Sequence, residues 1–142
     1  MGLKEYQIIA KNYELAGRAS SEIKKIVKSL NLSKKLSKRI CAASYEAEIN
    51  VVIHSFGGYM TFENFGDEYI EINVYDDGPG IKDIELAMTE GYSTATELDH
   101  TNGFGAGMGL ANIKKLSDVL EIQSDPMGTH LRIIFLIGEV DA

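Results

Sequence analysis

A carboxylate and an amide stand one helical turn apart in the first half of the chain, at Glu46 and Asn50. Residues four apart in a helix lie on one face, about 40° apart around its axis. Ala43, Ala47 and Val51 flank the pair, so we expect this face to be distinct from the basic surface of the neighbouring lysines. A carboxylate beside an amide oxygen suits a proton acceptor next to a magnesium ligand. An ordinary solvated Glu–Asn pair is the alternative.

A second candidate is Asp76, which ends a strand-like segment just before Gly78 and Gly80. Side chains alternate along a strand, so Asp76 shares the inward parity of Ile72 and Val74. An inward carboxylate needs a hydrogen-bond donor or a changed pKa. An adenine amino group would be such a donor, and the glycines would let the backbone approach a flat base. Because the same residues also make a good turn sequence, both interpretations stay open.

A third candidate is the glycine-rich run from Gly103 to Leu110, which directly precedes a helix-like pattern. Glycines before a helix N-terminus present backbone N–H groups to a phosphate, and the helix dipole strengthens that contact. The run matches neither the GxxxxGK[ST] nor the GxGxxG spacing. A flexible linker is the alternative, but Phe104 and Met108 are unusual in a linker. The run therefore favours phosphate binding.

Apolar periodicity predicts the elements that must position these residues. Helices are expected over about 19–30, 36–51 and 109–117, and Ser33 is a possible cap of the second. Strands are expected around 6–10, 60–63, 70–74, 120–122 and 131–135, with a hairpin turn at Gly66-Asp67. This order predicts an α/β two-layer sandwich, in which a mixed, mostly antiparallel sheet carries helices on one face.

The long segment 82–108 is polar and rich in Gly, Thr and Ser. A stretch of this length with little predicted structure is usually functional in a compact domain, so we expect a lid. No repeat or linker divides the chain, and we expect a single domain over 1–142.

Composition and charge exclude several classes of function. No apolar run approaches the roughly 20 residues of a membrane span, and we expect a cytoplasmic protein. One cysteine and three scattered histidines do not supply the four clustered ligands of a zinc site. The net charge of −7 argues against nucleic acid as a partner, although residues 1–58 hold ten Lys/Arg against five Asp/Glu. That basic half is either a solvated helical face or a docking face for an acidic protein.

These elements occur together in one order: Glu46-x-x-x-Asn50, Asp76-x-Gly78-x-Gly80, the glycine run, then Gly128-Thr129. The ordered set resembles the ATPase superfamily of gyrase, the Hsp90 chaperone, histidine kinases and MutL. Within it, the chain is most similar to bacterial anti-sigma-factor serine/threonine kinases and related partner-switching kinases. The resemblance extends over nearly the whole chain, from about Leu15 to Ile137, and implies the histidine-kinase-like ATPase fold.

The resemblance also implies roles for individual residues. Glu46 would be the general base and Asn50 the magnesium ligand in an ATP site. Asp76 would accept from the adenine amino group, Gly78 and Gly80 would lie near the base, and Thr129 would support the contact through its hydroxyl. The phosphate-binding end of the lid would comprise Gly103, Gly105, Gly107, Met108, Gly109 and Leu110.

By the same resemblance, the chain would be a magnesium-dependent protein kinase that phosphorylates a small anti-sigma-factor antagonist. A sigma factor or a phosphatase would be a further partner, and a homodimer is compatible with this group. The chain departs from this kinase pattern in one respect. Between Lys82 and Lys114 it has no Lys or Arg to neutralise charge on the γ-phosphate, only His100. A nucleotide-dependent binding switch without catalysis is therefore the main alternative, and an ATP hydrolase is a third.

Overall fold

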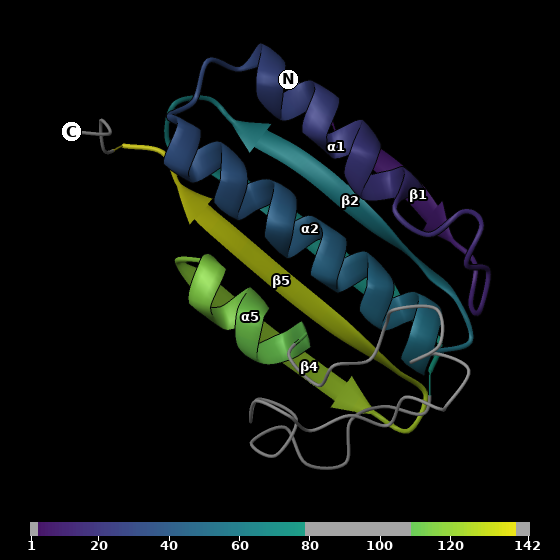
Figure 1. Ribbon diagram of the computed structural model, residues 1–142. Coiled ribbons are helices and arrows are strands. Elements are labelled where there is room, and N and C mark those ends of the chain that lie inside the picture. The colour runs from purple at the N-terminus through teal and green to yellow at the C-terminus, as the bar shows by residue number, and fades with distance from the viewer. Residues whose placement is uncertain (1–2, 79–108, 139–142) are drawn as a thin grey trace.

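The computed structural model describes residues 3–78 and 109–138 (Figure 1). Within these ranges the elements are β1 (Lys4–Ile8), α1 (Arg18–Ser29), α2 (Lys34–His54), β2 (Gly58–Phe65), β3 (Tyr69–Asp76), α5 (Gly109–Leu116), β4 (Val119–Asp125) and β5 (Gly128–Leu136). None of these described helices has both the length and the apolarity to cross a bilayer. The predicted helices and strands are all present, although β1 ends before Ala10.

The five strands form one sheet in the order β1-β2-β3-β5-β4. Every pairing between these strands is antiparallel, so the parallel contribution expected of a mixed sheet does not occur among them. The β2–β3 hairpin turns at Gly66, whose φ of 63° lies in the left-handed region that glycine adopts readily. The three helices of the described residues lie on one face of the sheet, which confirms the two-layer α/β class (Figure 1).

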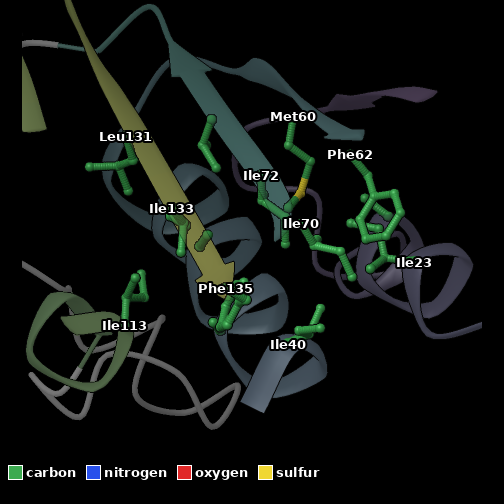
Figure 2. Close-up of a cluster of buried hydrophobic side chains, with 14 of the residues drawn as sticks. Ile23, Ile40, Met60, Phe62, Ile70, Ile72, Ile113, Leu131, Ile133 and Phe135 are labelled. Carbon is green, nitrogen blue, oxygen red and sulfur yellow. The ribbon is translucent and has the colours of Figure 1, made fainter. Parts of the chain in front are cut away.

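The hydrophobic core fills the space between the helices and the sheet (Figure 2). Alternate residues of the central strands point into it, including the fully buried Phe62 on β2 and Phe135 on β5. The helices contribute one apolar stripe each, represented by Ile23 on α1, Ile40 on α2 and Ile113 on α5. The inward-facing residues of the strands, which recur with period two, therefore pack against the apolar stripes of the helices, which recur with period 3.6.

The two long helices begin in different ways. Ser33 caps α2 as the sequence predicts, because its side chain accepts a hydrogen bond from the Leu36 backbone N–H at 3.1 Å. The cap of α1 is Gly17, which has no side chain to serve the free N–H groups of that helix. Glu48 of α2 serves them instead, and its buried carboxylate accepts from the backbone N–H groups of Gly17, Ala19 and Ser20 at 3.0, 3.2 and 2.9 Å.

Glu48→Ala should therefore destabilise the protein by about 2–4 kcal/mol, because it leaves three N–H groups at the start of α1 without their charged acceptor. Urea unfolding measures this loss. Glu22→Ala is the matched control, since Glu22 forms an exposed ion pair with Lys25 and should change stability by about 0.5 kcal/mol or less. Equal losses in the two variants would contradict the capping role of Glu48.

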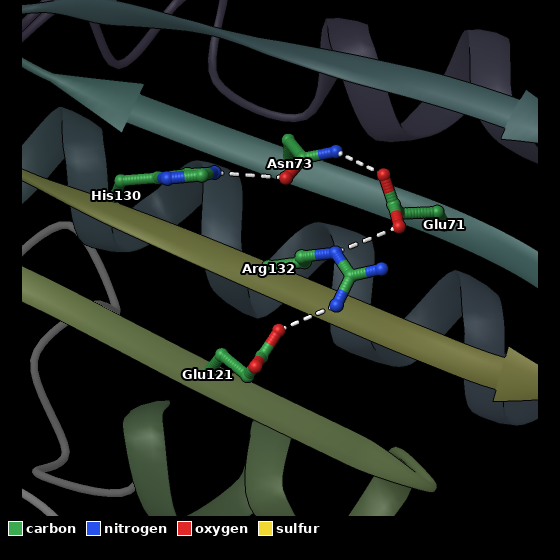
Figure 3. A network of polar contacts seen from close by, with 5 residues as sticks. All are labelled: Glu71, Asn73, Glu121, His130 and Arg132. Carbon is green, nitrogen blue, oxygen red and sulfur yellow. Dashed lines mark hydrogen bonds and ion pairs between the residues drawn. The ribbon is translucent and has the colours of Figure 1, made fainter.

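The face of the sheet away from the helices carries a polar network (Figure 3). Arg132 on β5 donates to Glu71 on β3 at 2.8 Å and to Glu121 on β4 at 2.5 Å. Asn73 joins Glu71 to His130 through hydrogen bonds of 2.9 and 2.8 Å. These bonds tie three neighbouring strands together across their outer face, while the core secures the inner face.

Candidate nucleotide site

The predicted pair Glu46 and Asn50 lies in the C-terminal half of α2. Both side chains are half-buried and point from the same side of the helix toward α5. The stripe that anchors α2 to the sheet consists of Ala43, Ala47 and Val51, all buried as the sequence predicts. Because this stripe fixes the rotation of the helix, it also fixes where the carboxylate and the amide are presented.

The Glu46 carboxylate is in a partly desolvated setting. Burial raises the pKa of this carboxyl, and a hydrogen bond with the Asn112 side chain on α5 opposes the rise. A carboxylate with a raised pKa is a better proton acceptor than a solvated one. Asn112 was not among the residues that sequence reasoning selected; its only signal is its place one helical turn after Gly109.

The start of α5 packs directly against Asn50. A Cβ atom added at Gly109 would lie 2.7 Å from Asn50 Oδ1, which is closer than such atoms approach without displacement. Because Gly109 has no side chain, the Asn50 side-chain amide has room to lie at the N-terminus of α5. Free backbone N–H groups and the helix dipole favour an anion at this position. Leu110, the next residue, is buried and anchors this end of α5.

Gly109→Ala should lower magnesium-ATP affinity about tenfold while leaving stability close to that of the parent. The added methyl group would turn the Asn50 side chain away from its position, a shift worth roughly 1.4 kcal/mol if one contact is lost. Calorimetric titration measures the affinity and thermal unfolding measures the stability. Gly138→Ala is the control, because no atom lies within 4 Å of its added Cβ. Equal ATP affinity in both variants would remove Gly109 from the site.

Asp76 lies at the end of β3, where it pairs with Gly58 on β2 and Thr129 on β5. One carboxylate oxygen accepts from the Gly78 backbone N–H at 2.9 Å. Burial raises the pKa of Asp76, the backbone amides of Gly78 and Thr129 oppose that rise, and the neighbouring Asp77 adds to it. Asp76 keeps the inward parity that the sequence predicts, because it follows the buried Val74 by one strand period and lies opposite the buried Thr129.

Glycines let the chain close tightly around Asp76. A Cβ at Gly58 would lie 2.0 Å from the Tyr75 carbonyl oxygen, and one at Gly128 would lie 2.2 Å from that of Asp76. A Cβ at Gly78 would meet both Asp76 Oδ1 and Ser55 Cβ at 3.0 Å, which places the carboxylate beside the end of α2. This packing is compatible with both interpretations of the segment: the predicted turn, and a surface that a flat base can approach.

The hydroxyl of Thr129, to which the resemblance assigns a supporting role, contacts a second hydroxyl in this structure. It forms a 2.9 Å hydrogen bond with the Ser124 hydroxyl on β4, while the backbone amide of Thr129 faces Asp76. Support of adenine recognition through that hydroxyl stays a prediction. Several other predicted site residues lie outside the described residues, together with the lid over 82–108: Gly80, Gly103, Gly105, Gly107 and Met108.

Four elements therefore meet at one end of the molecule: the C-terminal half of α2, the end of β3, the start of β5 and the start of α5. Among the described residues, no group of three or more His, Cys, Asp or Glu side chains could hold a metal ion by itself. The amide of Asn50 suits magnesium differently, because this ion usually keeps several waters and takes one or two protein ligands together with nucleotide phosphates. The donor set thus fits a metal that arrives with ATP.

The comparisons with known proteins agree with this arrangement. The family model described as the histidine kinase-like ATPase domain matches residues 9–135, and the chain belongs to this family. It is 36% identical over 104 residues to a protein named anti-sigma F factor from Caldanaerobacter subterraneus, covering 70% of this chain and 69% of the relative. It is also 32% identical over 89 residues to the serine/threonine-protein kinase RsbT of Bacillus subtilis, covering 61% of each. The resemblance to partner-switching kinases is thereby confirmed.

Solved structures share the fold. The RsbU and RsbW domains of Rv1364c from Mycobacterium tuberculosis superpose with a TM-score of 0.65 at 16% identity, covering 96% of this chain and 32% of that one. The mycobacterial sensor histidine kinase MprB gives a TM-score of 0.54 at 17% identity, covering 95% and 97%. At such identities the likeness establishes the architecture, and the roles of individual residues depend on the site itself.

Proposed function

We propose that this chain is an ATP-dependent protein serine/threonine kinase of a bacterial partner-switching pathway. It moves the γ-phosphate of ATP to a Ser or Thr hydroxyl of a small antagonist protein in the cytoplasm. The observation that carries the proposal is that both members of the pair face α5: Asn50 lies against Gly109, which begins the helix, and Glu46 is hydrogen-bonded to Asn112. Similarity to proteins named anti-sigma F factor and serine/threonine-protein kinase RsbT supports it.

Each residue of the site has a distinct role in this proposal. Asp76 accepts a hydrogen bond from the adenine amino group and orients the base at the end of β3. The first N–H groups of α5 hold the phosphates, and Asn50 holds the magnesium ion, which neutralises phosphate charge when bound. Gly80 and the residues Gly103 to Met108 complete the base and phosphate contacts as the resemblance implies.

Glu46 is the general base of the transfer step. The partner hydroxyl oxygen forms a bond to the γ-phosphorus as the bond to the β–γ bridging oxygen breaks, and ADP leaves with that electron pair. The hydroxyl proton passes to the Glu46 carboxylate, whose partial burial suits it to accept. Positioning of the two reactants supplies most of the remaining acceleration.

The alternative function is a nucleotide-dependent switch that selects partners without catalysis. One observation favours it: the sequence between Lys82 and Lys114 contains no Lys or Arg to neutralise charge on the γ-phosphate. A kinase with this sequence would transfer slowly, or would receive the cation from its partner.

Single-turnover labelling separates the two functions. The protein is mixed with γ-labelled ATP, magnesium and, in separate reactions, the purified small proteins encoded beside it. The kinase proposal expects label on a Ser or Thr of one such protein. If ATP binds but no neighbouring protein gains label at saturating magnesium-ATP, the kinase proposal is wrong and the switch is favoured.

A further inference from the structure

The outer side of α1 and α2 concentrates the positive charge of the chain. Residues 18–41 contain eight Lys or Arg and one acidic residue, whereas the rest of the chain contains six against twenty. A protein whose net charge is −7 therefore presents one strongly basic region on two adjacent helices. Figure 1 shows α1 and α2 side by side over the sheet, so this region is continuous in space.

Four exposed lysines lie on these two adjacent helices, and we call them the lysine seam: Lys24 and Lys28 on α1, Lys34 and Lys38 on α2. Lys34, Lys38 and Cys41 recur at helical spacing, so they share one face of α2. Cys41 is half-buried, and the charges of Lys24 and Lys28 lower its pKa against the larger raising effect of burial. This influence places the α1 lysines beside the α2 face that carries the other two.

Within the part of the chain that the structure describes, no carboxylate forms an ion pair with a lysine of the seam. The ion pairs of this region use other side chains, since Lys25 binds Glu22 and Arg39 binds Asp118, each at 3.2 Å. Like charges one helical turn apart destabilise a helix by a few tenths of a kcal/mol. An opposing acidic surface would remove that repulsion.

We propose that the lysine seam docks an acidic surface of a partner protein. The inference goes beyond the proposed kinase activity, because the seam lies away from the nucleotide site and its docking requires no transfer. Lys38 precedes Asn50 by twelve residues of α2, or about 18 Å along the helix axis. A partner held at Lys38 would therefore bind about this distance from the nucleotide end of the molecule.

The surroundings of the seam favour a protein over a nucleic acid. Tyr45 continues the α2 face beyond Cys41 and is 42% exposed, and tyrosine is enriched in protein–protein interfaces. A duplex carries charge continuously, about one per 1.7 Å, so much of it would extend past the seam. There it would meet the acidic remainder of the chain and be repelled. An acidic patch on a folded protein is local and avoids this cost.

Two double variants with the same change in net charge test the proposal. Lys28→Glu/Lys38→Glu reverses the seam, and Lys4→Glu/Lys114→Glu reverses two exposed lysines outside it. The binding probe is a fluorescein-labelled peptide of alternating Glu and Gly, compared with a Gln–Gly peptide of equal length and with a short DNA duplex. Fluorescence anisotropy without nucleotide gives the affinities, and circular dichroism verifies that both variants are folded.

The proposal expects the parent to bind the Glu–Gly peptide in preference to the other two probes. It expects the seam variant to bind that peptide about tenfold more weakly, with less salt dependence, and the control variant to stay near the parent. Equal weakening in both variants would show that only net charge matters and would overturn it. Stronger binding of the duplex, no peptide binding, or a parent dimer that only the seam variant abolishes would overturn it as well.

Discussion

Glu46→Gln should leave ATP affinity close to that of the parent and slow phosphoryl transfer by about a hundred-fold or more, the usual scale for a general base. The substitution keeps the size of the side chain and removes its ability to accept the hydroxyl proton. It also leaves an amide beside Asn112, so the packing between α2 and α5 should persist. Single-turnover phosphorylation of the partner, beside an ATP titration, measures the two quantities separately.

Asn50→Ala is the matched comparison, because it removes the other half of the pair on the same face of α2. It should weaken magnesium-dependent ATP binding and transfer together, whereas Glu46→Gln affects transfer alone. A non-catalytic switch predicts that Glu46→Gln keeps partner binding and its nucleotide dependence, with no transfer to lose. Transfer at the parent rate by Glu46→Gln would refute the assignment of the base.

Asp76→Asn should weaken ATP binding by about ten- to a hundred-fold, which corresponds to one charged hydrogen bond of roughly 1.5–3 kcal/mol. The carboxylate at the end of β3 can only accept when it is ionised, while an amide can also turn a donor toward the adenine amino group. Asp77→Asn is the control, because Asp77 is an exposed neighbour with the same charge. Calorimetric titration giving one affinity for the parent and Asp76→Asn would remove Asp76 from the base contact.

Asp76→Asn should weaken ATP binding but should not destabilise the nucleotide-free protein near neutral pH. Burial raises the pKa of Asp76 in the folded state above its value in the unfolded chain. The stability that this carboxyl contributes is then complete below the unfolded pKa and is lost as the pH rises through the folded pKa. Near neutral pH, the free energy of unfolding of Asp76→Asn should thus be at least as large as that of the parent. It should also fall less than that of the parent as the pH rises through the range in which carboxyl groups titrate. Urea titrations at several pH values measure this, and a steeper loss in the variant would contradict it.

Local sequence patterns determined much of the fold. The apolar spacing of Ala19, Ile23 and Val27 identifies the buried face of α1, and Ser33 marks the start of α2. Strand parity alone places Asp76 on the inward side of its strand, whichever strands pair with β3. These features depend on residues within one or two turns of each other, so local propensity and burial suffice to predict them.

The pairing of the strands was harder to predict from the sequence. The sequence indicates antiparallel hairpins where a turn is short, but the order β1-β2-β3-β5-β4 sets β5 beside β3 although more than fifty residues separate them. That contact brings the buried Thr129 opposite the half-buried Asp76 at the end of the sheet. Non-local pairing depends on the packing of the whole core, which no local pattern encodes.

Tertiary structure alone decided the contacts that complete the site. Glu48 resembles any helical glutamate in the sequence, yet it lies buried beneath the start of α1 because α1 and α2 pack together. The fit of Gly109 against Asn50 and the bond from Asn112 to Glu46 likewise arise only where α5 meets α2. The sequence by itself identified candidate side chains for phosphate binding and transfer, because residue chemistry and spacing along one helix or strand are local properties. Packing of elements distant in the chain decided which of them face one another.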